Sequence, residues 1–238
     1  GYNSTKYCQE VLITLVDEIQ TAKAQRKNGA LLSLDIRKAF DTISHSFINQ
    51  AYEFFNFGAN FIKWLNIIGT NRRACIILEN DMYSKFFNLE RGNAQGDTTS
   101  PYIFNIGYQI LLLKLNFDLQ IAGLIVPPVV PPDLQARPAG QEVNNFTRKI
   151  YAFADDGNLL TELTFNSLAR VKKILTEFGT ISGLECNVEK TTLMPVGTNL
   201  PISDEIVQLG FKIENTVTVL GLEISGDNSN TGTIWDTV

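Results

Sequence analysis

The chain has few residues of the kinds that build disulfide frameworks, zinc sites or membrane spans. Its 238 residues include three cysteines and one histidine. Cys8, Cys75 and Cys186 are widely separated and lack metal-ligand spacing, which predicts reduced, buried thiols and no disulfide framework. No apolar run approaches the roughly 20 residues that a membrane span requires, and no signal-peptide pattern is present. We therefore expect an intracellular protein with no membrane partner. The sequence does not distinguish between the nucleus and the cytoplasm.

An excess of basic residues is also lacking. The 20 lysines and arginines are outnumbered by 25 acids, for a net charge of −5. Proteins that grip phosphates usually carry a basic surface, so this balance counts against simple nucleic-acid binding. Acids gathered at a metal site, or basic segments of a longer protein outside this chain, would remove that conflict.

Hydrophobic residues, by contrast, make up 44% of the chain, enough to bury a large core. Apolar spacings of three and four predict helices, and short apolar runs between turn residues predict strands and hairpins. The expected helices cover 5–27, 44–55, 60–69, 102–119 and 165–181; the expected strands are 30–34 and 191–196, with hairpins over 74–89, 150–160 and 207–224. This mixture predicts an α+β fold, with a mostly antiparallel sheet and helices packed on one face.

Two adjacent carboxylates, Asp155 and Asp156, interrupt the apolar stretch IYAFADDGNLL. Taken alone, they most resemble an Asp-Asp-Gly turn at the surface. Side chains alternate faces along a strand, so both acids serve one site only if the turn bends the backbone there, as Gly157 would make easy.

A third acid, Asp35, ends the apolar strand predicted at 30–34. If this strand neighbours the 150–160 hairpin, three carboxylates converge at one edge of the sheet, where cations must neutralise them. Carboxylate oxygens suit Mg²⁺, and two such ions stabilise the attacking and leaving oxygens of phosphoryl transfer. The pattern therefore predicts a two-metal site.

Five blocks of the chain, in order, resemble the conserved blocks of a reverse transcriptase palm: LLSLDIRKAFDTISH, RGNAQGDTTSPYIF, YAFADD, GLECNVEKT and VLGLEIS. They extend from about residue 31 to 224. FADD and KAFDTISH look most like the non-LTR (LINE-type) retrotransposon branch. The resemblance implies a right-hand polymerase palm with part of the fingers over residues 1–226, a Pro-rich insertion at 127–140 and a frayed tail at 227–238. The N-terminal fingers strands and the thumb of the family are not visible in this chain.

The resemblance also implies roles for individual residues. The ligands of two Mg²⁺ ions, with Mn²⁺ as the alternative, would be Asp35, Asp155, Asp156 and the carbonyl of Ile36, and Lys190 would protonate the pyrophosphate leaving group. The nucleotide would be bound by Lys38, Ala39, Phe40, Arg91, Gln95 and Gly96, and Leu220 and Gly221 would steady the primer end. Phe40 stands at the steric-gate position, which predicts a preference for deoxynucleotides. His45, by contrast, is interpreted as a helix-start residue and not a base.

The implied activity is RNA-templated DNA synthesis with an RNA template, a DNA primer, dNTPs and the remaining parts of a parent polyprotein. Two alternatives stay open. One is a catalytically inactive, nucleic-acid-binding remnant of such a polymerase, and the other is a palm of the group II intron maturase type. Many relatives have proline where Thr98 stands, which leaves the stiffness of that loop open.

Overall fold

The fold is known from a computed structural model, which describes residues 8–37, 39–69, 72–78, 82–93, 96–124, 149–197 and 201–226. The expected insertion at 127–140 and tail at 227–238 lie outside these residues. The chain divides into two compact units. The first, here the sheet unit, consists of Gly1–Asp35, Lys114–Lys173 and Asn187–Val238; the second, the helical unit, consists of Ile36–Leu113 and Ile174–Cys186.

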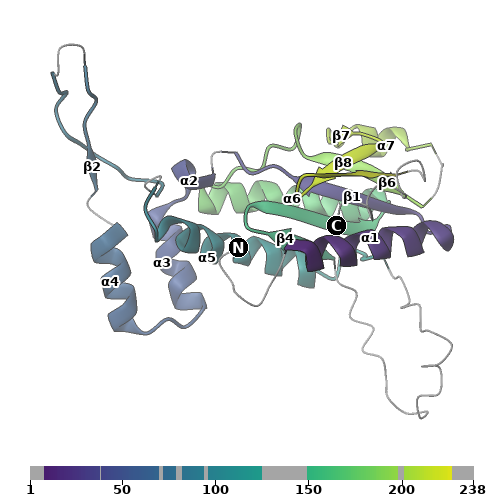
Figure 1. Ribbon diagram of the computed structural model, residues 1–238, viewed down its shortest axis with the longest axis horizontal. Helices are drawn as coiled ribbons and strands as arrows, with labels where there is room; N and C mark the ends of the chain where they lie inside the picture. Colours follow the sequence, from purple (N-terminus) through teal and green to yellow (C-terminus); the bar gives the residue numbers. More distant parts are fainter. Residues whose placement is uncertain are drawn as a thin grey trace, which may run out of the picture. The chain divides into compact units, whose positions relative to one another are not determined.

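A five-stranded sheet with the order β4-β5-β1-β6-β7 forms the centre of the sheet unit (Figure 1). Its strands are β1 (Gly29–Leu34), β4 (Ile150–Phe153), β5 (Asp156–Glu162), β6 (Thr192–Val196) and β7 (Lys212–Ile213). All neighbours pair antiparallel except β6 and β7, which are parallel. A separate hairpin joins β8 (Thr216–Val219) to β9 (Leu222–Ser225), and α7 (Asp204–Val207) precedes β7. The predicted α+β class with a mostly antiparallel sheet is confirmed.

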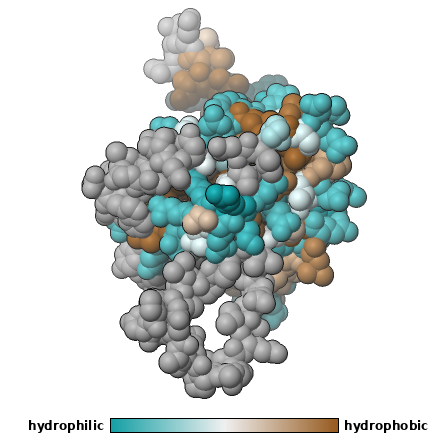
Figure 2. Space-filling model, turned by 90° about the vertical axis from the view of Figure 1, so that its right-hand side faces the viewer, coloured by the Kyte–Doolittle hydropathy of each residue, from teal (hydrophilic) through white to brown (hydrophobic). Residues whose placement is uncertain are grey.

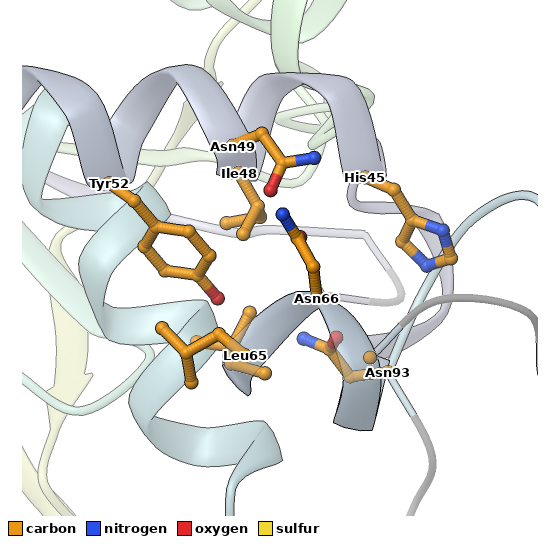
Figure 3. Close-up of a pocket in the computed structure, with 9 residues that line it drawn as sticks. His45, Ile48, Asn49, Tyr52, Leu65, Asn66 and Asn93 are labelled. Atoms are coloured by element: carbon orange, nitrogen blue, oxygen red, sulfur yellow. The ribbon is translucent and has the colours of Figure 1, made fainter. Parts of the chain in front are cut away.

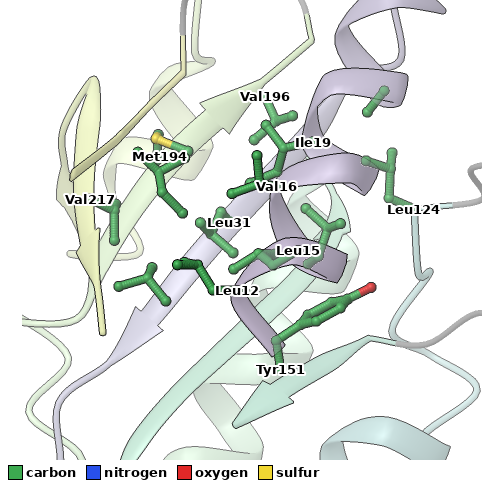
Figure 4. Packing of buried hydrophobic residues seen from close by; sticks show 14 residues of the cluster. Leu12, Leu15, Val16, Ile19, Leu31, Leu124, Tyr151, Met194, Val196 and Val217 are labelled. Carbon is green, nitrogen blue, oxygen red and sulfur yellow. The ribbon is translucent and has the colours of Figure 1, made fainter. Parts of the chain in front are cut away.

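Helix α1 (Cys8–Ala24) packs on one face of this sheet. Leu12, Leu15, Val16 and Ile19, spaced by three and four, share a cluster with β-strand residues such as Leu31 (Figure 4). The hairpin β8–β9 adds further apolar side chains to the same cluster, namely Val217, Val219 and Ile224. The predicted amphipathic helix is therefore present, and it gathers strands that are distant in sequence into one core.

The opposite face of the sheet is also covered. Leu32, Leu159 and Leu193 are in register on three neighbouring strands and are fully buried. Leu168 and Val171, in the part of α6 (Phe165–Ser182) that belongs to this unit, are equally buried. Strands buried on both faces read as continuous apolar runs, which is how β1 looks in the sequence.

A cluster of buried charged residues lies just after the C-terminal end of α5 (Ser100–Phe117), in the sheet unit. Arg170 donates to Oδ2 of Asp118 from both Nε (3.2 Å) and Nη2 (2.7 Å). Lys149, itself buried, donates from Nζ to the backbone carbonyl of Asp118 at 2.6 Å. Hydrogen bonds from Arg170 are the main reason that the pKa of Asp118 falls from 3.8 to about 2, against the opposing effect of burial. The cluster thus fixes the start of β4 with ionised groups.

We expect Asp118→Asn to lower the free energy of unfolding by about 2 kcal/mol at neutral pH. A carboxyl whose pKa is depressed by folding stabilises the fold above its unfolded pKa, and this stabilisation is lost as the pH falls from about 4 to about 2. Urea unfolding at pH 7 and near pH 2 measures the difference, with Asp17→Asn on the exposed face of α1 as the control. If the free energies of unfolding of the variant and the wild type differed by the same amount at both pH values, this account would be contradicted.

The helical unit contains α2 (Ala39–Thr42), α3 (His45–Phe54) and α4 (Ala59–Gly69), and the short strands β2 (Arg73–Ala74) and β3 (Phe87–Asn88). Ser44 caps α3 as predicted, because its hydroxyl accepts from the amide of Phe47 at 3.4 Å. The predicted 74–89 hairpin is present, but β2 and β3 pair over only two residues each, with an isolated bridge between Ile77 and Tyr83.

Two sequence expectations were wrong. Residues 207–213 do not pair with 217–224: β7 instead joins the main sheet in parallel with β6, and the final hairpin is β8 with β9. A short apolar run gives no information on its partner strand, so the sequence could not distinguish these pairings. Cys75 and Cys186 were expected to be buried, but both are partly exposed.

Candidate active site

The three acids predicted to share a site all belong to the sheet unit. Strands β1 and β5 are antiparallel neighbours, with Leu34 opposite Gly157. Asp35 directly follows β1 and Asp156 begins β5, so continuing the register by one residue places these two acids level with each other. Residues that are level on adjacent strands lie on the same face of a sheet. The structure therefore places Asp35 and Asp156 at the same end of the strands and on the same face of the sheet. More than a hundred residues of sequence separate them.

The turn between β4 and β5 differs from the expected one. Phe153 pairs with Asp156, so Ala154 and Asp155 alone make a two-residue turn. Ala154 takes the positive φ of 55° that such a turn requires, whereas Gly157 lies within β5 and is buried. Asp155 is thus a turn residue and Asp156 a strand residue. The bend is therefore at Ala154 and Asp155 and not at the glycine that follows the two acids.

The face that carries Asp35 and Asp156 changes character along the strands. Beneath α1 it is apolar, with Leu31 in register with Leu160 and Met194; two residues farther, Ser33 is in register with Asn158 and Thr192. The acids follow after two more residues. Asn158 is only 2% exposed, and its Oδ1 has no hydrogen-bond partner among the described residues. The site thus lies at the polar end of a sheet face whose other end is the core.

The two neighbouring carboxylates affect each other electrostatically. Partial desolvation raises the pKa of Asp156 even though the residue as a whole is exposed, and the negative charge of Asp155 raises it further. Asp35, Asp155 and Asp156 are all exposed. Within the described part of the chain, no three or more His, Cys, Asp or Glu side chains are grouped closely enough to hold a metal ion. A cation near these oxygens would reverse the pKa shift, because positive charge favours the ionised form.

The segment that contains Lys190 is fastened to this edge through the backbone. The amide of Asn187 donates to the carbonyl of Asp35 at 2.9 Å, and the carbonyl of Asn187 accepts from the amide of Lys190 at 3.1 Å. The side chain of Lys190 is exposed. Lys190 is therefore three residues from a direct contact with the backbone of Asp35.

Leu220 and Gly221 form the two-residue turn between β8 and β9. Their φ angles are 51° and 83°, both in the left-handed region, as in a type I′ hairpin turn. A leucine rarely adopts this conformation, but here the side chain packs against the apolar cluster beneath α1. That packing holds a strained residue at the tip of the hairpin.

The other predicted nucleotide contacts belong to the helical unit. The ring of Phe40 is half-buried and lies 5.4 Å from that of Phe104, centroid to centroid. The backbone of Ile36 forms an isolated bridge with Cys186. Ala39 begins α2, and Lys38 lies outside the described residues.

The second predicted nucleotide-binding segment is the loop before α5. Arg91 is exposed, and its backbone forms an isolated bridge with Ser44. Gly96 is exposed with a φ of 85°, and nothing lies within 4 Å of the position that a Cβ would occupy. Gln95 lies outside the described residues.

A model of the family "Reverse transcriptase (RNA-dependent DNA polymerase)" matches residues 1–224. The chain belongs to this family. The order of the five sequence blocks agrees with that assignment, and so does the palm-like α+β fold of this reverse transcriptase domain.

Relatives of this reverse transcriptase domain include proteins of R2 elements. It is 28% identical over 184 residues to a "Retrovirus-related Pol polyprotein from type-1 retrotransposable element R2" of Popillia japonica. The aligned region covers 76% of this chain and 23% of that protein. It is also 28% identical over 161 residues to the corresponding polyprotein from the type-2 element R2DM of Drosophila melanogaster, at 67% and 13% coverage. These relatives agree with the predicted non-LTR branch. The chain spans less than a quarter of their length.

Solved structures of similar fold include telomerases. Apo telomerase of Candida tropicalis, truncated from its C-terminal domain, superposes with a TM-score of 0.59 at 14% identity, over 94% of this chain and 39% of the other. Telomerase of Candida albicans in complex with a telomeric RNA fragment gives a TM-score of 0.58 at 13% identity, over 94% of this chain and 33% of the other. At this identity the likeness shows the fold alone.

Among the helices of the described residues, none is sufficiently long and apolar to cross a membrane. On the face of the reverse transcriptase domain shown in Figure 2, hydrophilic side chains predominate, with hydrophobic ones scattered among them.

Sequence reasoning missed Asn158, and it assigned His45 only the role of a helix-start residue, which is confirmed because α3 begins there. Asn158 lies two residues after Asp156 on β5 and carries a buried oxygen with no hydrogen-bond partner in the described part of the chain, and His45 hydrogen-bonds to the loop that contains Arg91. Asn158 stands two residues after Asp156, a spacing that places both on one strand face, so period-two alternation was the available signal. For His45, the available sequence signal was that it is the one histidine of the chain.

Proposed function

We propose that this reverse transcriptase domain synthesises DNA on an RNA template by two-metal nucleotidyl transfer, as part of a non-LTR retroelement. The family assignment and the R2 relatives support this proposal. The observation that carries it is the register of β1 and β5, which aligns Asp35 with Asp156 beside Asp155. Nothing in the structure or the comparisons favours a maturase-type palm.

The ions in this proposal are two Mg²⁺, with Mn²⁺ as the alternative. Asp35, Asp155 and Asp156 would hold them together with the carbonyl of Ile36, because hard cations prefer oxygen ligands. The three carboxylates are exposed, with Asp35 and Asp156 at neighbouring strand ends and Asp155 in the adjoining turn, so their side chains have room to change rotamer around an ion. When bound, the ions supply stabilisation of the attacking and leaving oxygens.

The nucleotide contacts are assigned by the family motifs. Main-chain groups of Lys38 and Ala39 would contact the triphosphate, and Phe40 would exclude the ribose 2′-OH. The loop with Arg91, Gln95 and Gly96 would border the sugar, the templating base and a phosphate. A dNTP, an RNA template and a DNA primer are therefore the proposed substrates.

Two further roles concern the primer and the leaving group. Leu220 and Gly221 form the tip of a rigid hairpin that packs against the core of the sheet unit, a suitable support for a primer end. Lys190 is exposed and fastened through Asn187 to the backbone of Asp35, which suits a proton donor to the pyrophosphate. Other parts of a longer polypeptide would supply the positive charge that this chain, at −5, lacks.

Primer extension tests the proposal directly. We expect the full-length polypeptide that carries this chain to extend an annealed DNA primer on an RNA template when Mg²⁺ and dNTPs are supplied, and to stop when EDTA removes the metal. A folded protein that binds the primer–template but incorporates no nucleotide with either Mg²⁺ or Mn²⁺ would instead indicate the inactive remnant.

A further inference from the structure

A row of polar side chains crosses the main sheet directly behind the proposed metal-binding acids. The strand register aligns Tyr151 on β4, Asn158 on β5, Ser33 on β1 and Thr192 on β6. Asn158 follows Asp156 by two residues on the same strand, so both side chains lie on the face that also carries Asp35. All of these residues belong to the sheet unit. On these strands, the row is therefore the layer of side chains next to the acids.

Asn158 is the member of this row whose hydrogen bonding is incomplete. It is 2% exposed, and no described residue donates a hydrogen bond to its Oδ1. A buried acceptor without a donor costs free energy, so native proteins usually provide one. An apolar side chain would avoid this cost, as Leu160 does two residues farther along the same face. The oxygen of Asn158 therefore needs a donor.

The neighbours of Asn158 in the row do not supply that donor. Tyr151 has one hydroxyl proton and donates it to Oε2 of Glu18 on α1. Figure 4 shows the ring of Tyr151 beside α1. On the other side, Ser33 and Thr192 are only partly buried, so water can reach the row there. Water is thus a donor available to Asn158 where the side chains of the row are not.

A second buried amide atom without a partner lies in the helical unit and has the opposite character. Figure 3 shows Asn93 at a pocket that is also lined by Tyr52 and Asn66. Its unpaired atom is Nδ2, a donor, and none of the described residues that line this pocket is acidic. The water ligands of a cation donate hydrogen bonds, so they need acceptors around them. Asn158, unlike Asn93, combines an unpaired acceptor with neighbouring carboxylates.

We infer that Asn158 is a positioning residue for the divalent ion of the active site: its Oδ1 accepts a hydrogen bond from a water ligand of the ion proposed for Asp35 and Asp156. This inference rests on the proposed two-metal function. Mg²⁺ loses its waters reluctantly and keeps several of them when one or two carboxylates bind it. Asn158 itself contacts neither substrate nor metal.

The spacing along β5 suits this arrangement. Two residues of a strand span about 7 Å. A water ligand lies about 2.1 Å from Mg²⁺, and its hydrogen bond reaches about 2.8 Å farther, so one water can bridge from an ion at Asp156 to the amide of Asn158. Partners of this kind orient the ligands of a metal and increase its affinity.

Three substitutions at one position separate the acceptor from packing. Asn158→Val and Asn158→Ala remove the acceptor, and valine also suits a buried strand position. Asn158→Asp keeps an acceptor oxygen in the same place. Thr161→Val is the matched control on the same strand, because Thr161 is buried on the opposite face and donates from its hydroxyl to the carbonyl of Ala122 at 2.6 Å.

Binding of Mn²⁺ to the full-length polypeptide, followed by electron paramagnetic resonance, gives a readout that does not depend on DNA synthesis. The site under test is the one that the wild type has and Asp155→Asn lacks. We expect Asn158→Val and Asn158→Ala to raise its dissociation constant for Mn²⁺ about tenfold, and Asn158→Asp to bind at least as tightly as the wild type. Thr161→Val should stay within about twofold of the wild type.

Thermal unfolding without metal provides the second readout. Loss of an unpaired acceptor removes no hydrogen bond, so Asn158→Val should unfold at or above the wild-type temperature. Thr161→Val loses a bonded hydroxyl and should unfold about 3 °C lower. A lower unfolding temperature in Asn158→Val with an unchanged dissociation constant for Mn²⁺ would show a merely structural role and would overturn the inference.

The remaining outcomes separate this inference from the function on which it rests. Equal dissociation constants in the wild type and Asn158→Ala would overturn the inference, and so would an increase in Asn158→Asp as large as that in Asn158→Val. If Asp155→Asn instead binds as many Mn²⁺ ions as the wild type, the proposed metal site itself fails.

Discussion

Asp155→Asn is expected to abolish primer extension on an RNA template, with a loss of about 10²–10³-fold or more in kcat. The substitution retains the size and shape of the side chain but removes one of the charges that would hold the two divalent ions. Since Asp155 is an exposed turn residue, the fold should remain intact. Single-turnover extension in Mg²⁺ measures the effect, with circular dichroism to confirm folding.

The matched control is Asp204→Asn, which makes the same change of charge at an exposed position of the sheet unit. It should extend primers at nearly the wild-type rate. Full activity of Asp155→Asn, with wild-type dependence on Mg²⁺ concentration, would remove the proposed metal site. Asp35→Asn should be as inactive as Asp155→Asn, because the strand register places Asp35 beside Asp156.

Phe40→Ala is expected to admit ribonucleotides. A bulky ring at this position would collide with the 2′-OH of an incoming ribonucleotide, so its removal should lower the preference for dNTP over rNTP by about 10²-fold, mostly through KM for the rNTP. The ring packs against Phe104, so some loss of stability accompanies the substitution. Parallel measurement of kcat/KM for dCTP and rCTP on one template gives the ratio.

Phe40→Tyr keeps the bulk of the ring and should retain the preference for deoxynucleotides. Phe54→Ala removes a ring that is 68% exposed on α3 and serves as the control for aromatic loss in the same unit. Unchanged sugar discrimination in a folded, active Phe40→Ala protein would reject the gate role and leave the ring with packing alone.

Much of the local structure followed from the sequence. The apolar spacing in α1 and α6, the cap at Ser44 and the apolar run of β1 are local patterns, and local patterns are sufficient for elements whose buried side is continuous along the chain. The family blocks also identified the three acids. Their roles remain proposals, although their placement on adjacent strands agrees with the sequence interpretation.

Pairing and turn geometry could not be read in this way. The pairing of β7 with β6 and of β8 with β9 depends on which apolar surfaces are left uncovered once the sheet has formed. The turn at Ala154–Asp155 likewise departs from the expected glycine position, because the register with β1 requires Gly157 inside the strand.

By itself, the sequence determined the family of this protein and its α+β class, and it indicated the residues that we propose for nucleotidyl transfer, because these depend on residue types in a fixed order. Only the tertiary structure decided that Asp35 is level with Asp156 and that the ring of His45 holds the carbonyl of Gly92. Both are contacts between residues remote in the chain. Such contacts arise from strand register and close packing, which no periodicity in a single segment encodes.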